Sequence, residues 1–400
     1  MRLLYLLAKF PNFLLRRGPD ERKNIHFLKP RFRLNNLHTG VCRFKRPLSP
    51  SNEDNLRDTF SITQGEGIIL CEMKAVLITE PGPPAVLRIR EVPEPQPAEG
   101  DLLIRVKATS LNRADLLQRR GMYPPPAGTR EDIPGLEFSG TVLESREPES
   151  RFKTGDRVMG LLPGEGYAEL VRTPAVTVMP VPRNLSFEEA AAVPEVFATA
   201  YDALFRQVGL KEGERLLIHA VGSGVGTAAV QLSREAGVIV FGTAGSKEKL
   251  SKATELGLGV GINYRTTNFV ETVMHQTDNA GVDAILDLVG AANWEGNLSV
   301  LRPTGRMIII GLVSGSKVEA DLSVILRKRL RLMGSVLRFR TLVERTQLAH
   351  LMNENVLPLF EQGRLTPVID RVYPWQEVSA AHTYMEENRN FGKIVLAGQW

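Results

Sequence analysis

The chain has 400 residues, of which 43% are hydrophobic and 24% charged, and its formal net charge is +5. This length suits two domains of ordinary size with buried cores, and the composition is that of a soluble globular protein. The charge is uneven, because residues 1–50 contain twelve Lys/Arg but only Asp20 and Glu21, which leaves −5 on residues 51–400. The basic total therefore gives no reason to expect nucleic-acid binding by the folded part.

Residues 1–72 are predicted to be an N-terminal extension, either disordered or a targeting segment. They are rich in arginine and poor in acids, as mitochondrial presequences are, although Asp20 and Glu21 depart from that pattern. A disordered tail, or a start codon placed upstream of Met73, explains the same composition. No apolar run reaches the length of a membrane span. We expect a cytoplasmic protein, or a mitochondrial one if residues 1–72 act as a presequence.

Both cysteines, Cys42 and Cys71, precede Met73. A disulfide framework and a thiolate metal site are therefore excluded from everything that follows Met73, which is compatible with a reducing compartment.

From Met73 to about Ala190, short apolar runs separated by Pro and Gly clusters predict a series of strands. Such frequent short strands are typical of a compact, β-barrel-like domain. The predicted strands are Met73–Thr79, Val86–Val92, Leu102–Ala108, Gly140–Glu144, Arg157–Gly160 and Ala168–Arg172.

From Ser186 onward, strands alternate with helices, which predicts βαβ units and a parallel sheet. The first helix is expected over Phe187–Leu204, and Arg331–Arg340 and Pro367–Val395 have strand-like sequence again. The strands of the parallel sheet are expected at Arg215–His219, Val238–Gly242, Ile262–Tyr264, Ala284–Val289 and Arg306–Gly311.

A glycine-rich turn follows the strand Arg215–His219, and the helix after it has apolar residues at helical spacing. Strand, glycine turn and helix in this order favour phosphate binding at the helix N-terminus. The fingerprint is incomplete, because Val221 and Ser223 occupy its first two glycine positions, so a turn that binds nothing is the alternative. The residues predicted to bind a cofactor here are Ser223, Gly224, Val225 and Gly226.

The next strand ends in Thr243-Ala-Gly-Ser-Lys-Glu-Lys249, where an NAD site would place a carboxylate against the ribose 2′-hydroxyl. Hydroxyl and cationic groups suit a 2′-phosphate instead, which favours NADPH over NADH. The alternative is a solvated helix start that carries lysines. The candidate residues are Gly245, Ser246, Lys247 and Lys249, joined by Tyr264 and Arg265.

Several motifs in a fixed order resemble the zinc-free quinone oxidoreductases of the medium-chain dehydrogenase/reductase superfamily. The resemblance covers residues 73 to about 397 and has no counterpart for residues 1–72. The motifs are Gly135-Leu-Glu-Phe-Ser-Gly140, Phe152-Lys-Thr-Gly-Asp-Arg-Val158, Ala190-Ala-Ala-Val-Pro194, His219–Gln231, Leu111–Pro126 and Asn390-Phe-Gly-Lys-Ile-Val395.

The resemblance implies an α/β protein with a GroES-like β-barrel-type catalytic domain and an inserted Rossmann doubly wound parallel sheet. Residues 73–190 and 335–400 would form the catalytic domain and residues 191–334 the NADPH-binding domain, with the active site in the cleft. It also implies a homodimer, paired through the region Arg331–Leu337; a strongly strand-like edge of this kind needs a partner or a cover.

The resemblance also implies site residues. Asn112 matches a position near the nicotinamide, where its amide could bond a quinone oxygen, and Gly392 and Lys393 match a late cofactor contact. Tyr123 could stack on the substrate or donate its phenol, or simply pack within its loop. Asp115 could be catalytic or could cap the helix that it opens.

No metal is expected. The Gly-His-Glu position of zinc-dependent relatives reads Gly135-Leu136-Glu137, and no cysteine follows Cys71, so soft zinc ligands are missing. The scattered histidines, which we interpret as packed or surface residues, are His219, His275, His350 and His382.

Without a Lewis acid, the substrate must accept hydride unaided, which quinones do because their product is a delocalised phenolate. The sequence thus predicts an NADPH:quinone oxidoreductase. An enone or 2-enoyl-thioester reductase is one alternative, and a non-enzymatic NADPH-binding protein similar to lens crystallins of this superfamily is another.

Overall fold

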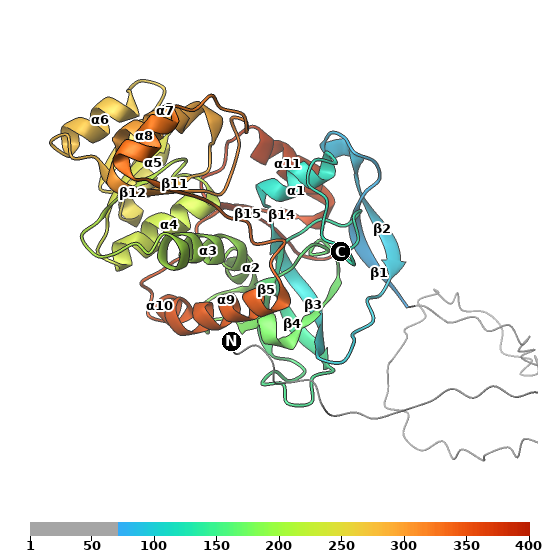
Figure 1. Ribbon diagram of the computed structural model, residues 1–400. Helices are drawn as coiled ribbons and strands as arrows, with labels where there is room; N and C mark the ends of the chain where they lie inside the picture. The colour runs from blue at the N-terminus through green and yellow to red at the C-terminus, as the bar shows by residue number, and fades with distance from the viewer. Residues whose placement is uncertain (1–70) are drawn as a thin grey trace, which may run out of the picture. The chain divides into compact units, whose positions relative to one another are not determined.

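The computed structural model describes residues 71–400, shown in colour in Figure 1. The predictions for residues 1–70 lie outside the described residues. Within residues 71–400, no helix combines the length and the apolarity needed to cross a membrane.

Both ends of the described chain contribute to one sheet, which is antiparallel except for the pair of strands at one edge. Its long central strand, β3 (Asp101–Ser110), pairs with β4 on one edge and with β15 on the other, where Val395 lies opposite Ser110. The sheet order is β14 (Ile369–Pro374), β15 (Lys393–Ala397), β3, β4 (Glu137–Ser145), β5 (Arg157–Leu161) and β7 (Val178–Pro180), and β6 (Leu170–Pro174) also pairs with β3. A separate antiparallel pair consists of β1 (Glu72–Ile78) and β2 (Leu87–Pro93).

The six strands predicted for this part of the chain are all present, with ends shifted by up to three residues. Alternation along β3 explains the packing, because Leu102, Ile104 and Val106 are buried while the residues between them are more exposed. The same hydrophobic core includes Trp375 and Ile394, so the end of the chain completes the core of its beginning.

The second sheet is parallel throughout, as predicted, and has the doubly wound order in which the chain starts in the middle and moves outward on both sides. Its order is β10 (Val260–Asn263), β9 (Ile239–Ala244), β8 (Arg215–Ile218), β11 (Val282–Asp287), β12 (Leu301–Ile309) and β13 (Arg331–Gly334).

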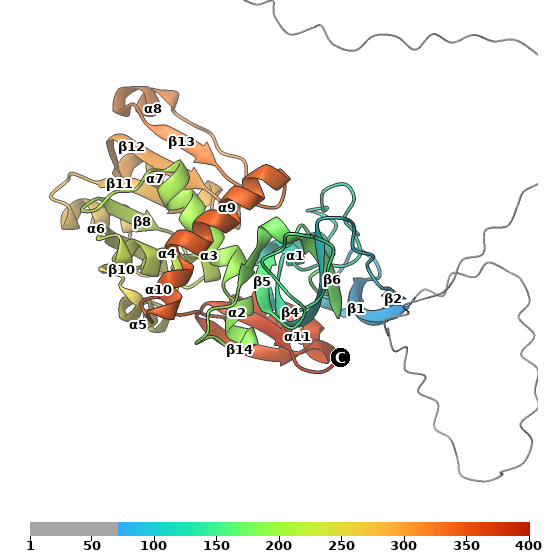
Figure 2. The ribbon, with the colours of Figure 1, turned by 90° about the horizontal axis from the view of Figure 1, so that it is seen from below.

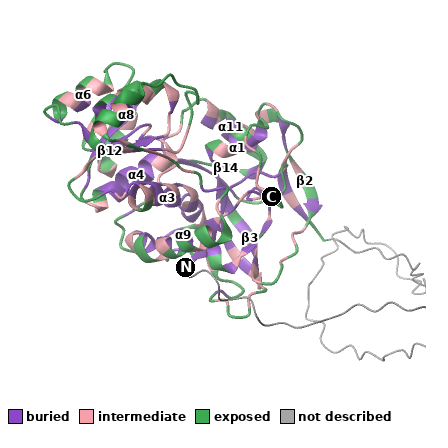
Figure 3. Cartoon of the chain, viewed as in Figure 1, coloured by how far each residue is buried: buried purple, intermediate pink, exposed green. Residues whose placement is uncertain are grey.

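Helices cover both faces of the parallel sheet, and the side-chain alternation of β8 shows why. Leu216 and Ile218 belong to one core, which includes residues of α3 (Pro194–Tyr201), α4 (Gly224–Glu235) and α5 (Lys247–Leu256). Leu217 belongs to the other core, with residues of α6 (Phe269–Gln276), α7 (Trp294–Val300) and α8 (Leu322–Lys328). Figure 3 shows the exposed outer surfaces of α6 and α8.

The remaining helices pack where the two sheets meet or against the first, mostly antiparallel sheet. α9 (Leu342–Asn355) and α10 (Leu357–Glu361) lie beside α3, as Figure 2 shows, and share its core. The others are α1 (Arg113–Arg119), α2 (Phe187–Ala191) and α11 (Val378–Glu386).

Three sequence predictions differ from the structure. The helix expected over Phe187–Leu204 is broken, because Pro194 lacks an N–H and starts a new helix, α3, which continues as a π-helical turn over Asp202–Gln207. The strand-like segment Pro367–Val395 contains α11 between its two strands. The alternating segment Arg331–Arg340 pairs as a strand only as far as Gly334.

Candidate active site

The glycine turn predicted from the sequence joins β8 to α4. Ser223 is the N-cap of α4, and its Oγ accepts a hydrogen bond from the Gly226 N–H at 3.0 Å. A Cβ on Gly226 would lie 2.4 Å from the Ala220 carbonyl oxygen, so only glycine allows this close packing of helix on strand. The other first N–H groups of a helix have no intrahelical partner and face outward, where they attract anions.

The end of the chain lies directly against this turn. The Gly392 N–H donates to the Gly222 carbonyl at 2.9 Å, and Ser223 and Gly392 form a parallel bridge. A Cβ on Gly224 would lie 2.6 Å from Cδ of Lys393, so the lysine side chain runs over the turn. The structure therefore brings together the predicted cofactor residues of the turn with Gly392 and Lys393.

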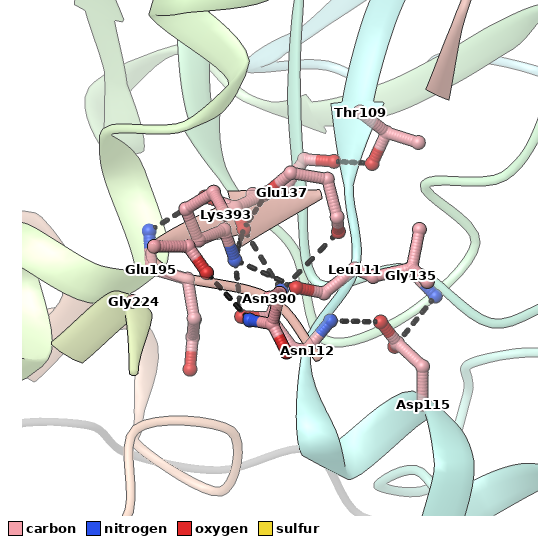
Figure 4. A network of polar contacts seen from close by, with 12 residues as sticks. Thr109, Leu111, Asn112, Asp115, Gly135, Glu137, Glu195, Gly224, Asn390 and Lys393 are labelled. Carbon is pink, nitrogen blue, oxygen red and sulfur yellow. Dashed lines mark hydrogen bonds and ion pairs between the residues drawn. The ribbon is translucent and has the colours of Figure 1, made fainter. Parts of the chain in front are cut away.

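Lys393 enters a buried polar network with Glu137, shown in Figure 4. Its Nζ donates to Asn112 Oδ1 at 2.7 Å, to the Leu111 carbonyl at 2.8 Å and to Glu137 Oε1 at 3.0 Å. Both side chains are nearly inaccessible, at 4% for Lys393 and 0% for Glu137. The ammonium and the carboxylate therefore compensate each other away from water.

The amide of Asn112 has its hydrogen bonds inside this network. Nδ2 donates to Glu137 Oε1 at 2.8 Å and to the Ser110 carbonyl at 3.3 Å, while Oδ1 accepts from Lys393. In this arrangement Asn112 orients the Glu137–Lys393 pair and has no amide hydrogen left for another acceptor.

Asp115 forms a capping box at the start of α1 together with Asn112, the N-cap residue of that helix. Its Oδ2 accepts from the Asn112 N–H at 2.8 Å and from the Tyr167 hydroxyl at 3.1 Å, and its Oδ1 accepts from the Gly135 N–H at 3.2 Å. Burial raises the pKa of Asp115 to about 6, although these hydrogen bonds act in the opposite direction. Its observed contacts are those of a cap that also ties together three segments.

Tyr123 is held by an arginine that the sequence analysis did not single out. Arg338 lies over the Tyr123 ring at 5.1 Å and donates to the Tyr123 carbonyl at 3.0 Å. It also donates to the Pro163 carbonyl at 2.7 Å and to Gln118 Oε1 at 2.5 Å. Arg338 lies in the alternating segment Arg331–Arg340, whose pattern predicts a strand in which an arginine faces solvent, so the sequence carries no signal for its role.

A pocket beside this arginine is lined by five leucines, one proline and four charged residues. Glu195, the second residue of α3, lies among them. The lining residues are Leu136, Leu161, Leu162, Pro163, Glu195, Leu337, Arg338, Arg340, Arg345 and Leu348. Apolar walls with a few polar groups are typical of small-molecule sites, and the free volume of about 10 Å³, room for one water molecule, means that a substrate must displace side chains to enter.

The residues predicted to meet a 2′-phosphate gather at the ends of β9 and β10. Ser246 Oγ accepts from the Lys249 N–H at 3.2 Å and so caps α5, and Gly245 lies against Tyr264 and Arg265. Lys249 Nζ donates to the carbonyls of Asn388 and Asn390, at 2.7 and 2.8 Å, and burial lowers its pKa. One ammonium hydrogen of Lys249 thus stays unused.

The histidines are dispersed, as predicted. His219 is buried between Thr243 and Asn297, and His382 is buried beside Arg119 and Tyr167. Among residues 71–400, no group of three His, Cys, Asp or Glu side chains is placed to bind a metal ion.

Two protein families match this chain. Residues 98–183 match the alcohol dehydrogenase GroES-like domain, and residues 256–396 match the zinc-binding dehydrogenase family. The human synaptic vesicle membrane protein VAT-1 homolog is 34% identical over 328 residues, which cover 78% of this chain and 82% of that protein. Human quinone oxidoreductase is 32% identical over 332 residues, which cover 81% of this chain and 97% of that protein.

Solved structures give the same result. A mycobacterial protein complexed with NADPH superposes with a TM-score of 0.74 at 27% identity, covering 82% of this chain and 100% of that one. The CurK enoyl reductase superposes with a TM-score of 0.72 at 29% identity, covering 81% of this chain and 99% of that one.

The chain therefore belongs to the medium-chain dehydrogenase/reductase superfamily, with its GroES-like domain and its Rossmann-type parallel sheet. Within it, the chain is an oxidoreductase of the quinone oxidoreductase type. The fold class and the family predicted from the sequence are confirmed.

Proposed function

We propose that this protein is an NADPH-dependent, metal-independent reductase that transfers hydride to quinones, ortho-quinones among them. The observation that carries the proposal is that one segment, the start of α3, both packs on the glycine turn and lines a mainly apolar pocket. Glu195 lines the pocket, while its neighbour Val196 packs against Gly224 of the turn. A redox cofactor bound at the turn and a flat substrate bound in the pocket would therefore meet beside the start of α3.

The turn fits a dinucleotide phosphate. Gly226 permits the close packing of α4 on β8, and the outward N–H groups at the start of α4 provide donors without a cationic side chain. When bound, reduced nicotinamide would supply the hydride. The Ser223 hydroxyl would hold it, while Gly392 and Lys393, whose hydrogen-bond donors are already used within the protein, would orient it by contact.

The end of β9 supports NADPH over NADH. Ser246, Lys249 and Tyr264 offer a hydroxyl, a partly buried ammonium and a phenol, and Arg265 lies beside them. Glu248 is exposed and pairs with Lys252 at 2.8 Å, so its charge is compensated on α5 itself. Cationic and hydroxyl groups bind a phosphate dianion, whereas a carboxylate would repel it.

Ser246→Asp tests this site, because aspartate remains a good N-cap for α5 but adds a negative charge. We expect kcat/KM for NADPH to fall by about 100-fold, since like charges in contact cost several kcal/mol, and kcat/KM for NADH to change little. Ser246→Asn is the matched control, which caps without a charge and should keep the preference for NADPH. Equal efficiency of the wild type with NADPH and NADH would defeat the proposal.

The pocket supports a flat acceptor that needs no Lewis acid. Leu136, Leu162 and Leu337 are among its lining residues, and position 136 holds a side chain that cannot bind zinc. Steady-state turnover of an ortho-quinone with NADPH, after dialysis against a chelator and with zinc measured in the same sample, tests this part. Stoichiometric zinc, or loss of activity on chelation, would contradict it.

The likeness to an enoyl reductase supports a second candidate, reduction of enones or 2-enoyl thioesters in the same pocket. Both substrates present a flat, electron-poor acceptor to the cofactor. Parallel assays of an ortho-quinone and a trans-2-enoyl thioester, compared by kcat/KM, decide between them.

We also propose that residues 73–190 with 335–400 form the catalytic domain and that residues 191–334 form the cofactor domain.

We propose as well that the protein is a homodimer. β13 is the last strand of the described parallel sheet, so one edge has no partner strand. Leu322 and Leu326 of the neighbouring α8 are 69% and 77% exposed. Light scattering should give a dimer for the wild type and a monomer for Leu326→Glu; a monomeric wild type would refute this.

A further inference from the structure

Glu195 carries a carboxyl group that the fold places in the pocket without a partner. It is the second residue of α3, directly after Pro194, and its backbone N–H donates to Glu137 Oε2 at 2.8 Å. That bond fixes the position of the residue, while the side chain lines the pocket among leucines. The residue is half-buried, and within residues 71–400 its carboxyl has no hydrogen bond or ion pair, although leucines and arginines both line the pocket.

Glu195 lies close both to the proposed cofactor site and to the proposed substrate pocket. The next residue, Val196, has its Cγ1 only 2.9 Å from where a Cβ on Gly224 would lie, so the start of α3 touches the glycine turn. Glu195 also lines the same pocket as Leu136 and Leu337. The carboxyl is therefore next to the place where we propose that cofactor and quinone meet.

The surrounding charges favour the neutral acid. Glu137, whose carboxylate accepts the Glu195 N–H, and Asp115 repel a second negative charge, while Lys393 and Arg338 act in the opposite direction. Lys393 is already paired with Glu137 at 3.0 Å. Burial is the largest cause and, with these charges, raises the pKa of Glu195 to about 8.

Three arginines also line the pocket, and the charge of Arg338 acts to lower the pKa of Glu195. Arg340 pairs with Asp202 at 2.6 Å, whereas the buried Nε of Arg345 has no hydrogen-bond partner among residues 71–400 and burial lowers the pKa of its guanidinium. Tyr123, below Arg338, has its pKa raised by burial and stays neutral. At neutral pH the pocket thus contains a carboxylic acid that can give up a proton.

We propose that Glu195, as the carboxylic acid, donates the proton that completes reduction of the quinone. This inference rests on the proposed function and deepens it. The quinone accepts a hydride, two electrons and one proton, from reduced nicotinamide, which becomes oxidised, and the quinone becomes the hydroquinone monoanion. The O–H bond of Glu195 then breaks as the second hydroquinone O–H bond forms, and the resulting carboxylate takes a proton from solvent before the next turnover.

Glu195→Gln tests the inference, because glutamine has nearly the same shape and keeps the backbone hydrogen bond to Glu137. We expect kcat with an ortho-quinone to fall by about 100-fold, the usual effect of losing a positioned acid. NADPH affinity, measured by fluorescence titration, should stay within about twofold. Glu255→Gln, which removes an exposed carboxylate of α5, should behave as the wild type.

The pH profile separates an acid from a residue that only shapes the pocket. Wild-type kcat/KM should decrease as pH rises through about 8, because the donor form is lost, and a solvent deuterium isotope effect should accompany turnover. In Glu195→Gln both the decrease and the isotope effect should disappear. Glu195→Asp, which keeps an acid at a greater distance, should retain the decrease at a lower rate.

The outcomes are distinguishable. A wild type that does not oxidise NADPH with any quinone defeats the proposed function itself. A wild type that is active, but whose kcat/KM is constant from about pH 6 to about pH 10, overturns only the role of Glu195, even if the glutamine variant fails to fold. An active Glu195→Gln with unchanged kcat and pH profile overturns it as well.

Discussion

The buried ion pair between Lys393 and Glu137 should contribute to stability as a unit, and the structure predicts how the free energy of unfolding changes when one or both charges are removed. The Nζ–Oε1 distance is 3.0 Å, and the side chains are 4% and 0% exposed. At an effective dielectric constant of about 20, two charges at this distance attract each other by about 5–6 kcal/mol before desolvation is counted. Desolvation offsets much of this attraction, so the net value of the pair is small while the cost of breaking it is large.

Lys393→Met removes the cation and leaves Glu137 buried without a counter-charge. We expect the free energy of unfolding to fall by about 3–5 kcal/mol. The double variant Glu137→Gln/Lys393→Met removes both charges, and the glutamine oxygen can still accept from Ser110 and Asn112. Its loss should be smaller than that of Lys393→Met by about 2 kcal/mol or more, the mark of direct coupling.

Denaturant unfolding of the cofactor-free protein, followed for all four members of the cycle, measures this coupling. The control is Lys252→Met, which removes an exposed pair with Glu248 that has a similar N–O distance, 2.8 Å. It should change stability by less than about 1 kcal/mol, because water screens that pair. If the effects of the two single substitutions simply add, the pair is not coupled and the electrostatic reasoning is refuted.

Two further substitutions test the turn and a buried histidine. In Gly226→Ala the new Cβ would lie 2.4 Å from the Ala220 oxygen, so we expect the free energy of unfolding to fall by about 1–3 kcal/mol and NADPH binding, measured by fluorescence, to be lost. In the control Gly334→Ala the new Cβ has open space, so neither quantity should change. Normal NADPH binding by Gly226→Ala would count against the turn as the cofactor site. Burial lowers the pKa of His382 to about 3, so the native state binds fewer protons than the unfolded state below the ordinary histidine pKa and loses stability as pH falls. Between about pH 6 and pH 4, His382→Gln should reduce the slope of the free energy of unfolding against pH by about 1.4 kcal/mol per pH unit. The control His350→Gln, which alters an exposed residue, should leave that slope unchanged. Equal slopes in the two variants would exclude His382 as the source of the pH dependence.

The sequence identified features that depend on neighbours along the chain. A strand, a glycine turn and an amphipathic helix require only a local pattern, so β8, Ser223 and α4 were located correctly. The same holds for Asp115, whose capping contact spans three residues. The break before Pro194 is also a local signal, and the prediction of one continuous helix is wrong because the proline ends the helix although the apolar spacing continues past it.

What only the tertiary structure decided is which distant residues meet. Lys393 reaches Asn112 and Glu137 across separations of 281 and 256 residues, and no periodicity in the sequence records those contacts. The sequence pattern around Arg338 and Glu195 is that of ordinary charged residues, and only packing buries Arg338 and places Glu195 in the pocket. Hydrophobic patterning fixes which face of an element is buried, but the chemistry of a buried charge depends on its partners, and folding of the whole chain selects those.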